Sequence, residues 1–241
     1  RERYFFKIKK DILGFLVNVI KPSKMNQREN LVINFLFDNM NKGIVLDVGS
    51  GDNWLWQYFH KLGWTNIIGI DPFINNDIFI NSNKVIYKCT FDEFIKNNNC
   101  DNIQAVMFNH SLEHIANPME TLKLAHSILP SNGKCLLRIP LNNGIAKRLW
   151  GYHWPTFDVP RHLWIPSINT INVLLQKCNF IINENIYENE IDVLVENYKN
   201  FKRESEIPNL SKIQKKYFNK LSMMSYVLGI SDIICLVLEK K

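Results

Sequence analysis

The sequence of 241 residues is 46% hydrophobic and carries a net charge of +6 at pH 7. This length suits one α/β domain with additions, and no uncharged apolar run is long enough to predict a membrane-spanning helix. The charge is uneven, because the first 28 residues hold eight Lys/Arg and two Asp/Glu, whereas the other 213 hold 21 of each sign. A neutral body argues against a broad nucleic-acid-binding surface, so we expect no nucleic acid partner.

The five cysteines lack the C-x-x-C spacing of a metal or redox motif. Such scattered cysteines are typical of free thiols in a reducing compartment, and we expect no signal peptide. We therefore expect a cytoplasmic protein.

Residues 1–24 predict a basic amphipathic helix that precedes a domain over residues 25–241. Apolar side chains recur at helical spacing along one stripe, and Lys21 and Pro22 end the pattern. We expect this helix to pack on the domain or to close over its site. Two alternatives remain open: the helix lies on the anionic inner face of the membrane, or it forms a dimer contact.

Further along the chain, short apolar runs alternate with helical patterns, which is typical of a doubly wound, mainly parallel α/β sheet. Seven strands are predicted at residues 44–49, 67–71, 84–89, 103–109, 134–139, 180–188 and 232–239. Helices are predicted at residues 54–62, 91–96, 118–129 and 167–178, with another helical pattern just before the first strand. Residues 141–166 and 189–231 exceed what this core needs, and we expect them to form a cap at the carboxyl edge of the sheet.

The first strand predicts a nucleotide-binding unit. Residues 44–51 run from apolar strand residues into a Gly-x-Gly turn, and the second predicted strand ends on Asp71. Trp54 stands where a dinucleotide site has its third glycine, and an indole there would obstruct the close approach that a pyrophosphate needs. Asp47 at the strand end favours a cofactor with a positive charge. S-adenosylmethionine fits, since it has a ribose, an ammonium and a sulfonium but no phosphate.

Residues 47–53, Asp-Val-Gly-Ser-Gly-Asp-Asn, resemble the first motif of class I S-adenosylmethionine-dependent methyltransferases, with Asn53 replacing its last glycine. Residues 90–92, 110–115 and 129–133 resemble later motifs of that family in the same order. The resemblance covers residues 43–187 and the final strand. It implies a seven-stranded, Rossmann-like methyltransferase fold with S-adenosylmethionine as cofactor.

Four predicted cofactor-binding residues surround the glycine turn. Gly49 and Gly51 would let the backbone approach the methionine part of the cofactor, because a Cβ at either position would collide with it. Asp47 would face the ammonium, directly or through water. Asp71 would accept hydrogen bonds from both ribose hydroxyls.

Three more predicted cofactor-binding residues lie downstream. Asp92 would take the adenine amino group while Phe91 packs on the ring, although Asp92 could instead cap the helix that follows. Asn109, at the end of the fourth predicted strand, would line the floor of the site near the sulfonium.

The candidate catalytic residues are His110, His114 and His162, which fall in loops expected to face the cofactor and could act as a general base. The string His110-x-x-Glu113-His114 also raises a metal question. It follows a strand rather than lying on a long helix, so it is not a zinc-protease motif. Either this loop holds a divalent ion or, as we expect, Glu113 and His114 hold the loop together by hydrogen bonds without a metal.

Residues 158–163 resemble a Pro-Arg-His-Leu segment of methyltransferases associated with surface-polysaccharide and lipid biosynthesis. Arg161 is predicted to clamp a phosphate or carboxylate of the substrate, or else to pair with Asp158. Tyr152 and Trp154 are predicted to stack on a sugar, or else to form an aromatic core of the cap.

We therefore expect an enzyme that moves a methyl group to an oxygen of a small-molecule acceptor. The resemblance favours a sugar, or a phosphorylated or phosphoramidate precursor, of a capsule or other surface glycan. One alternative is an isoprenoid-quinone or lipid O-methyltransferase that reaches the membrane through its N-terminal helix. Another is a non-catalytic partner protein that keeps the fold.

Overall fold

The computed structural model describes residues 27–61, 63–151, 154–188, 216–217, 220–221 and 230–241. The predicted N-terminal helix, Tyr152 and most of the segment 189–231 lie outside the described residues. Among the helices that are described, none is long and apolar enough to span a membrane.

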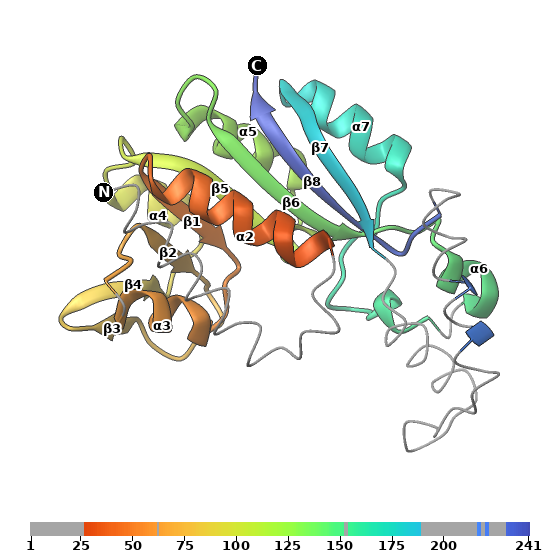
Figure 1. The fold of residues 1–241 in the computed structure, drawn as a ribbon, viewed down its shortest axis with the longest axis horizontal. Helices are drawn as coiled ribbons and strands as arrows, with labels where there is room; N and C mark the ends of the chain where they lie inside the picture. The colour runs from red at the N-terminus through yellow and green to blue at the C-terminus, as the bar shows by residue number, and fades with distance from the viewer. Residues whose placement is uncertain (1–26, 62, 152–153, 189–215, 218–219, 222–229) are drawn as a thin grey trace.

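In the described chain, eight strands form one sheet in the order β3-β4-β2-β1-β5-β6-β8-β7 (Figure 1). The strands are β1 (Ile44–Val48), β2 (Ile67–Ile70), β3 (Ile78–Ile80), β4 (Asn83–Tyr87), β5 (Ile103–Asn109), β6 (Lys134–Pro140), β7 (Phe180–Glu188) and β8 (Ile233–Lys240). The five strands β4, β2, β1, β5 and β6 are parallel, whereas β8 is antiparallel to both of its neighbours. The chain leaves β1 toward β2 and later returns to β5 on its other side, which is the switch point where doubly wound sheets bind ligands.

All seven predicted strands are present within two residues of their expected ends. The prediction missed β3, which pairs antiparallel with β4 at the edge of the sheet. A strand of three residues is too short to show the alternation of apolar and polar residues by which strands are predicted. The turn between these strands depends on positive φ angles at Asn81 and Ser82, 48° and 67°, rather than on a glycine.

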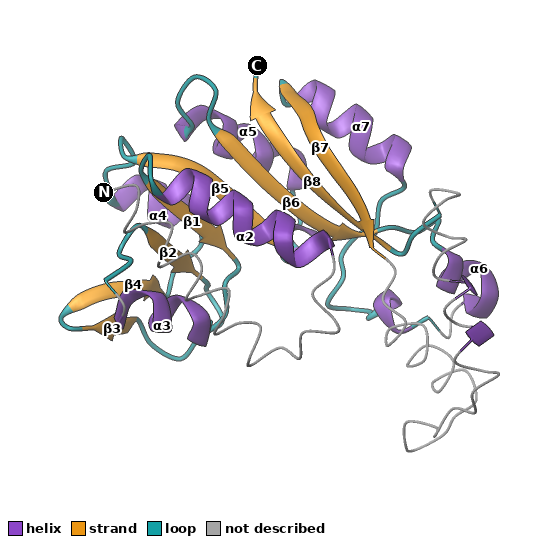
Figure 2. Ribbon diagram, in the orientation of Figure 1, coloured by secondary structure: helices purple, strands orange, loops and turns teal. Residues whose placement is uncertain are grey.

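Helices cover both faces of the sheet (Figure 2). They are α2 (Gln27–Met40), α3 (Trp54–Lys61), α4 (Phe91–Asn97), α5 (Pro118–Ile128), α6 (Ile145–Trp150) and α7 (Ile168–Lys177). Helices α2 and α3 share one hydrophobic cluster with the sheet, and α4, α5 and α7 share the other. The molecule therefore has three layers, with the sheet in the middle.

Side chains of the central strands point alternately to the two faces of the sheet, which explains the two hydrophobic clusters. On β1, Val45 packs under α2 and α3 while Leu46 packs toward the opposite helices, and both are fully buried. On β5, Met107 and Phe108 divide in the same way. Successive residues of a strand point to opposite faces, so these near-continuous apolar runs are what a sheet covered on both sides requires.

Helix α6 was not predicted and belongs to the cap segment 141–166; it lies beyond the carboxyl end of β6 (Figure 1). Its first turn depends on Asp232, whose carboxylate accepts a hydrogen bond from the backbone amide of Ala146 at 2.9 Å. A Cβ on Gly144 would collide with that carboxylate, which explains the glycine before the helix. Burial raises the pKa of Asp232 to about 7.

Candidate active site

The turn after β1 brings two glycines to the carboxyl edge of the sheet. Gly49 and Gly51 have φ angles of 77° and 59°, a region that glycine adopts without strain. A Cβ on Gly49 would collide with Ser111, whose hydroxyl donates to the carbonyl oxygen of Val48 at 2.5 Å. A Cβ on Gly51 meets nothing within 4 Å in the described part of the chain. Gly49 is therefore needed by the protein itself, whereas Gly51 faces open space that a ligand can use.

Asp71 closes the other side of this turn. Its carboxylate accepts hydrogen bonds from the backbone amides of Gly51, at 2.9 Å, and Phe73, at 2.7 Å. A carboxylate has about four acceptor positions, so two remain for a pair of hydroxyls. Gly51, Asp71 and Phe73 line a hollow of about 570 Å³ together with residues 74–78.

Asp47 is buried, with 2% of its surface exposed. One carboxylate oxygen accepts a hydrogen bond from Trp56 Nε1 at 2.7 Å, and the other, Oδ1, has no hydrogen-bond partner in the described structure. Burial raises the pKa of Asp47 to about 7, the indole N–H opposes the rise, and the charge of Asp71 adds to it. An unpartnered buried carboxylate oxygen behind an open glycine turn fits a cofactor that carries an ammonium group.

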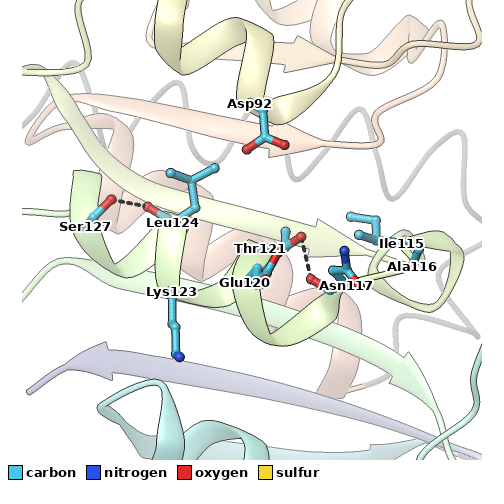
Figure 3. Close-up of a pocket in the computed structure, with 9 residues that line it drawn as sticks. All are labelled: Asp92, Ile115, Ala116, Asn117, Glu120, Thr121, Lys123, Leu124 and Ser127. Atoms are coloured by element: carbon cyan, nitrogen blue, oxygen red, sulfur yellow. Dashed lines mark hydrogen bonds between the residues drawn. The ribbon is translucent and has the colours of Figure 1, made fainter.

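Phe91 and Asp92, the two residues predicted to contact the adenine, lie in different surroundings in the structure. Phe91 is 7% exposed and packs edge-to-face against Phe108 in the core, with ring centroids 6.1 Å apart. Thr90, rather than Asp92, caps α4. Its side chain accepts a hydrogen bond from the backbone amide of Glu93, and its own backbone amide donates to the Glu93 carboxylate. Asp92 stays exposed and points from α4 into a hollow of about 600 Å³ beside α5 (Figure 3).

Asn109, at the end of β5, is held by a buried ion pair. Its side-chain oxygen accepts from Arg138 Nη1 at 3.2 Å, and Arg138 Nη2 lies 2.9 Å from Glu188 Oε2. Both charged side chains are largely buried, so Arg138 on β6 and Glu188 on β7 fix the side chain of Asn109 at the end of β5.

His110 follows Asn109 with a φ of 55°, which is rare for a residue with a side chain and often marks a functional position. Its Nδ1 lies 3.3 Å from Glu113 Oε1. Glu113 is completely buried, and its other oxygen, Oε2, has no hydrogen-bond partner among the described residues. The expected hydrogen bonding within the loop is thus present only in part.

A segment of the cap, residues 161–164, lies directly on the loop after β5. The backbone amide of Leu163 donates to the carbonyl oxygen of Glu113 at 2.9 Å, and Trp164 Nε1 donates to the carbonyl oxygen of Leu112 at 3.0 Å. His114 Nδ1 lies 2.9 Å from the carbonyl oxygen of Arg161. These contacts join segments about 50 residues apart in the sequence.

The same contacts bring His114 and His162 together. Their ring centroids are 4.8 Å apart, and His162 Nδ1 lies 2.6 Å from the carbonyl oxygen of Thr156. His110, His114 and His162 therefore share one region around Glu113.

The predicted substrate residues of the cap are placed differently from one another. Arg161 is 76% exposed, and its Nη2 pairs with Asp158 at 2.7 Å, as the alternative interpretation expected. Trp154 is 1% exposed and packs with Ala146 and Trp150, so its ring serves the core of the cap in this conformation.

Sequence reasoning missed several residues of the site. Phe73 is 89% exposed and lines the same hollow as Asp71. The sequence could have indicated it, because it is an aromatic residue in a polar turn two positions after the acid. Trp56 bonds an acid nine residues before it, and Ser111 and Arg138 bond residues on other strands; the hydrophobic and glycine patterns of the sequence mark none of these partners.

The strand order, the antiparallel β8 and the glycine turn facing an acid at the end of β2 together define a Rossmann-like methyltransferase fold. A family model described as a methyltransferase domain matches residues 24–185. The chain therefore belongs to the methyltransferase family. It is an enzyme, and the prediction of S-adenosylmethionine as its cofactor is confirmed at the level of the family.

Solved structures share this fold at low sequence identity. An S-adenosylmethionine-dependent methyltransferase from Archaeoglobus fulgidus is 18% identical, with a TM-score of 0.56 over 92% of this chain and 98% of that one. The cyclopropane synthase MmaA2 from Mycobacterium tuberculosis is 15% identical, with a TM-score of 0.54 over 90% of this chain and 86% of that one. None of the curated proteins matches the sequence.

Proposed function

We propose that this methyltransferase acts on a hydroxyl-type oxygen of a small anionic acceptor, namely a phosphorylated or phosphoramidate sugar precursor of a surface glycan. The observation that carries the proposal is the attachment of the Pro-Arg-His-Leu segment to the loop after β5. Through it, Arg161 and three histidines gather at the edge of the sheet that holds the glycine turn.

The cofactor would extend from the glycine turn toward Asp92. Support comes from the open space at Gly51, the remaining acceptor positions of Asp71 and the exposed ring of Phe73 in the same hollow. Asp47 Oδ1 supplies a buried negative charge for an ammonium. When bound, S-adenosylmethionine supplies an electrophilic methyl group on a sulfonium.

His110 is the general base that this geometry favours. Glu113 faces its Nδ1 and orients the ring, which leaves Nε2 to take the proton of the acceptor hydroxyl while the oxygen is methylated. Arg161 would hold the anionic group of the acceptor, because its ion pair with Asp158 engages Nη2 and its side chain is 76% exposed.

The test is methyl transfer from tritiated S-adenosylmethionine by the full chain. The acceptors are phosphorylated monosaccharides, each paired with its unphosphorylated sugar, and a solubilised quinol. We expect label on a phosphorylated sugar and a higher KM in Arg161→Gln, with Arg161→Lys between Arg161→Gln and the unmodified protein. Label on the quinol alone would replace this proposal with the lipid-type acceptor.

A further inference from the structure

A second feature of the histidine region is a cluster of metal-ligand type. Glu113, His114 and His162 each present one ligand atom, and these atoms all lie within 4.8 Å of one another. Two of the residues come from the loop after β5, and the third comes from the cap. The cluster differs from the sequence motif His110-x-x-Glu113-His114, because His162 takes the place of His110.

The buried carboxylate points to a missing positive charge. Glu113 has a side chain that is 1% exposed, and Oε1 faces His110 while Oε2 has no hydrogen-bond partner among the described residues. A buried carboxylate is costly unless it is paired or coordinates a metal ion. Arg161, the nearby cation of the cap, is exposed and pairs with Asp158 instead.

The hydrogen bonds of the two histidines favour the tautomer that leaves Nε2 for a metal ion. His114 Nδ1 faces the carbonyl oxygen of Arg161, and His162 Nδ1 faces the carbonyl oxygen of Thr156, at 2.9 and 2.6 Å. A carbonyl oxygen only accepts, so each Nδ1 carries the proton, and Nε2 of the neutral ring keeps its lone pair. Backbone carbonyls that orient histidines in this way are typical of metal sites.

We propose that Glu113, His114 and His162 bind one divalent transition-metal ion, of which Zn²⁺ is the reference case. Two imidazoles and one carboxylate suit zinc and its neighbours, whereas magnesium and calcium favour sites made of oxygen alone. Binding would draw the ligand atoms together to about 3.4 Å, the spacing around a tetrahedral ion with bonds of roughly 2.1 Å.

Such an ion would join the cap segment to the loop after β5. Three protein ligands leave a fourth position, where an oxygen of an acceptor could bind and lose its proton more easily. His114 and His162 would then be ligands, which leaves His110 as the base. The site itself is independent of the acceptor proposed above, because metal binding can be measured without methyl transfer.

The experiment titrates the tag-free, full-length chain with Zn²⁺ by calorimetry and with Co²⁺ by visible absorption. We expect one ion per chain and a tetrahedral Co²⁺ spectrum. His114→Ala, His162→Ala and Glu113→Gln should each weaken binding at least about tenfold. The matched control, His126→Ala on α5, should bind as the unmodified protein does.

Two further readouts separate metal binding from loss of fold. At the same Zn²⁺ concentration, thermal unfolding should shift upward in the unmodified protein and in His126→Ala, and by less in Glu113→Gln, which is isosteric and keeps an acceptor for His110. Absence of metal binding by the unmodified chain overturns the proposal. Equal binding by His162→Ala overturns it as well, because the ion would then lie elsewhere.

Discussion

Ser111 occupies the space that a side chain on Gly49 would need. Its hydroxyl donates to the carbonyl oxygen of Val48, so the loop after β5 is fixed to the end of β1, where the glycine turn begins. Gly51, two residues later, faces open space instead. Packing inside the protein therefore requires a glycine at position 49, whereas at position 51 the space is open to a ligand. Substitution of the two glycines should have different effects.

Gly49→Ala should lower the free energy of unfolding by about 2–4 kcal/mol, since it adds overpacking to the strain of a positive φ. Gly51→Ala should cost only the strain, about 1–2 kcal/mol, and should abolish cofactor binding. Urea denaturation and calorimetry with S-adenosylhomocysteine separate the two effects. Unchanged affinity in Gly51→Ala would show that the cofactor does not approach this turn.

Asp47 should link both stability and cofactor affinity to pH. Its pKa is about 7 in the folded chain against an ordinary 3.8. Between pH 3.8 and 7, Asp47 therefore keeps its proton in the folded protein but has lost it in the unfolded chain. The resulting stability is fully present below about pH 4 and is lost as the pH rises through 7. Denaturation curves across this range should show a slope that Asp47→Asn reduces.

Affinity should change in the opposite direction. The ammonium of S-adenosylhomocysteine needs an ionised Asp47, so binding should weaken as the pH falls from 8 to 6. Methylthioadenosine lacks the amino-acid part and serves as the matched control, with affinity that does not depend on Asp47. Equal pH dependence for both ligands would mean that Asp47 does not face the ammonium.

Asp232 should control the stability of α6. Its pKa of about 7 is likewise raised, so its contribution to stability is complete at low pH and declines as the pH rises through 7. Asp232→Ala leaves the buried amide of Ala146 unpaired and should lower the free energy of unfolding by about 1–3 kcal/mol. Asp232→Asn keeps an acceptor oxygen, so at pH 6 it should be closer to the unmodified protein, as thermal unfolding would show.

His110 should matter for turnover and not for binding. Asparagine tolerates a positive φ, so His110→Asn preserves the backbone at this position. We expect kcat to fall about 10²- to 10⁴-fold, the usual effect of losing a general base, with unchanged affinity for S-adenosylhomocysteine. A variant with normal kcat would remove His110 from the mechanism and direct attention to His114 and His162.

The strands and the glycine turn could be predicted because their signals are local. The run of apolar residues in β1, the glycines and the spacing to Asp71 all lie within 30 residues of one another. The same local pattern predicted α5 from Pro118 at its start and Pro130 beyond its end.

The cap and the partners within the site could not be predicted in the same way. That Trp154 fills a small core and that Glu113 is buried beneath the cap depend on how distant segments pack. For Asp47, the sequence predicts an acid at the end of a strand, but it does not reveal the burial of that acid or its bond to Trp56.

Calorimetry of S-adenosylhomocysteine with the purified chain tests the central claim most directly, with Asp71→Ala and Asp71→Asn beside it. Asp77→Ala is the matched control, since this acid lines the same hollow but pairs with Lys84 at 2.6 Å. We expect binding by the unmodified protein and by Asp77→Ala, with affinity at least roughly tenfold weaker in both Asp71 variants. No binding by the folded, unmodified chain, or equal binding by the Asp71 variants, would contradict the assignment of this turn as the cofactor site.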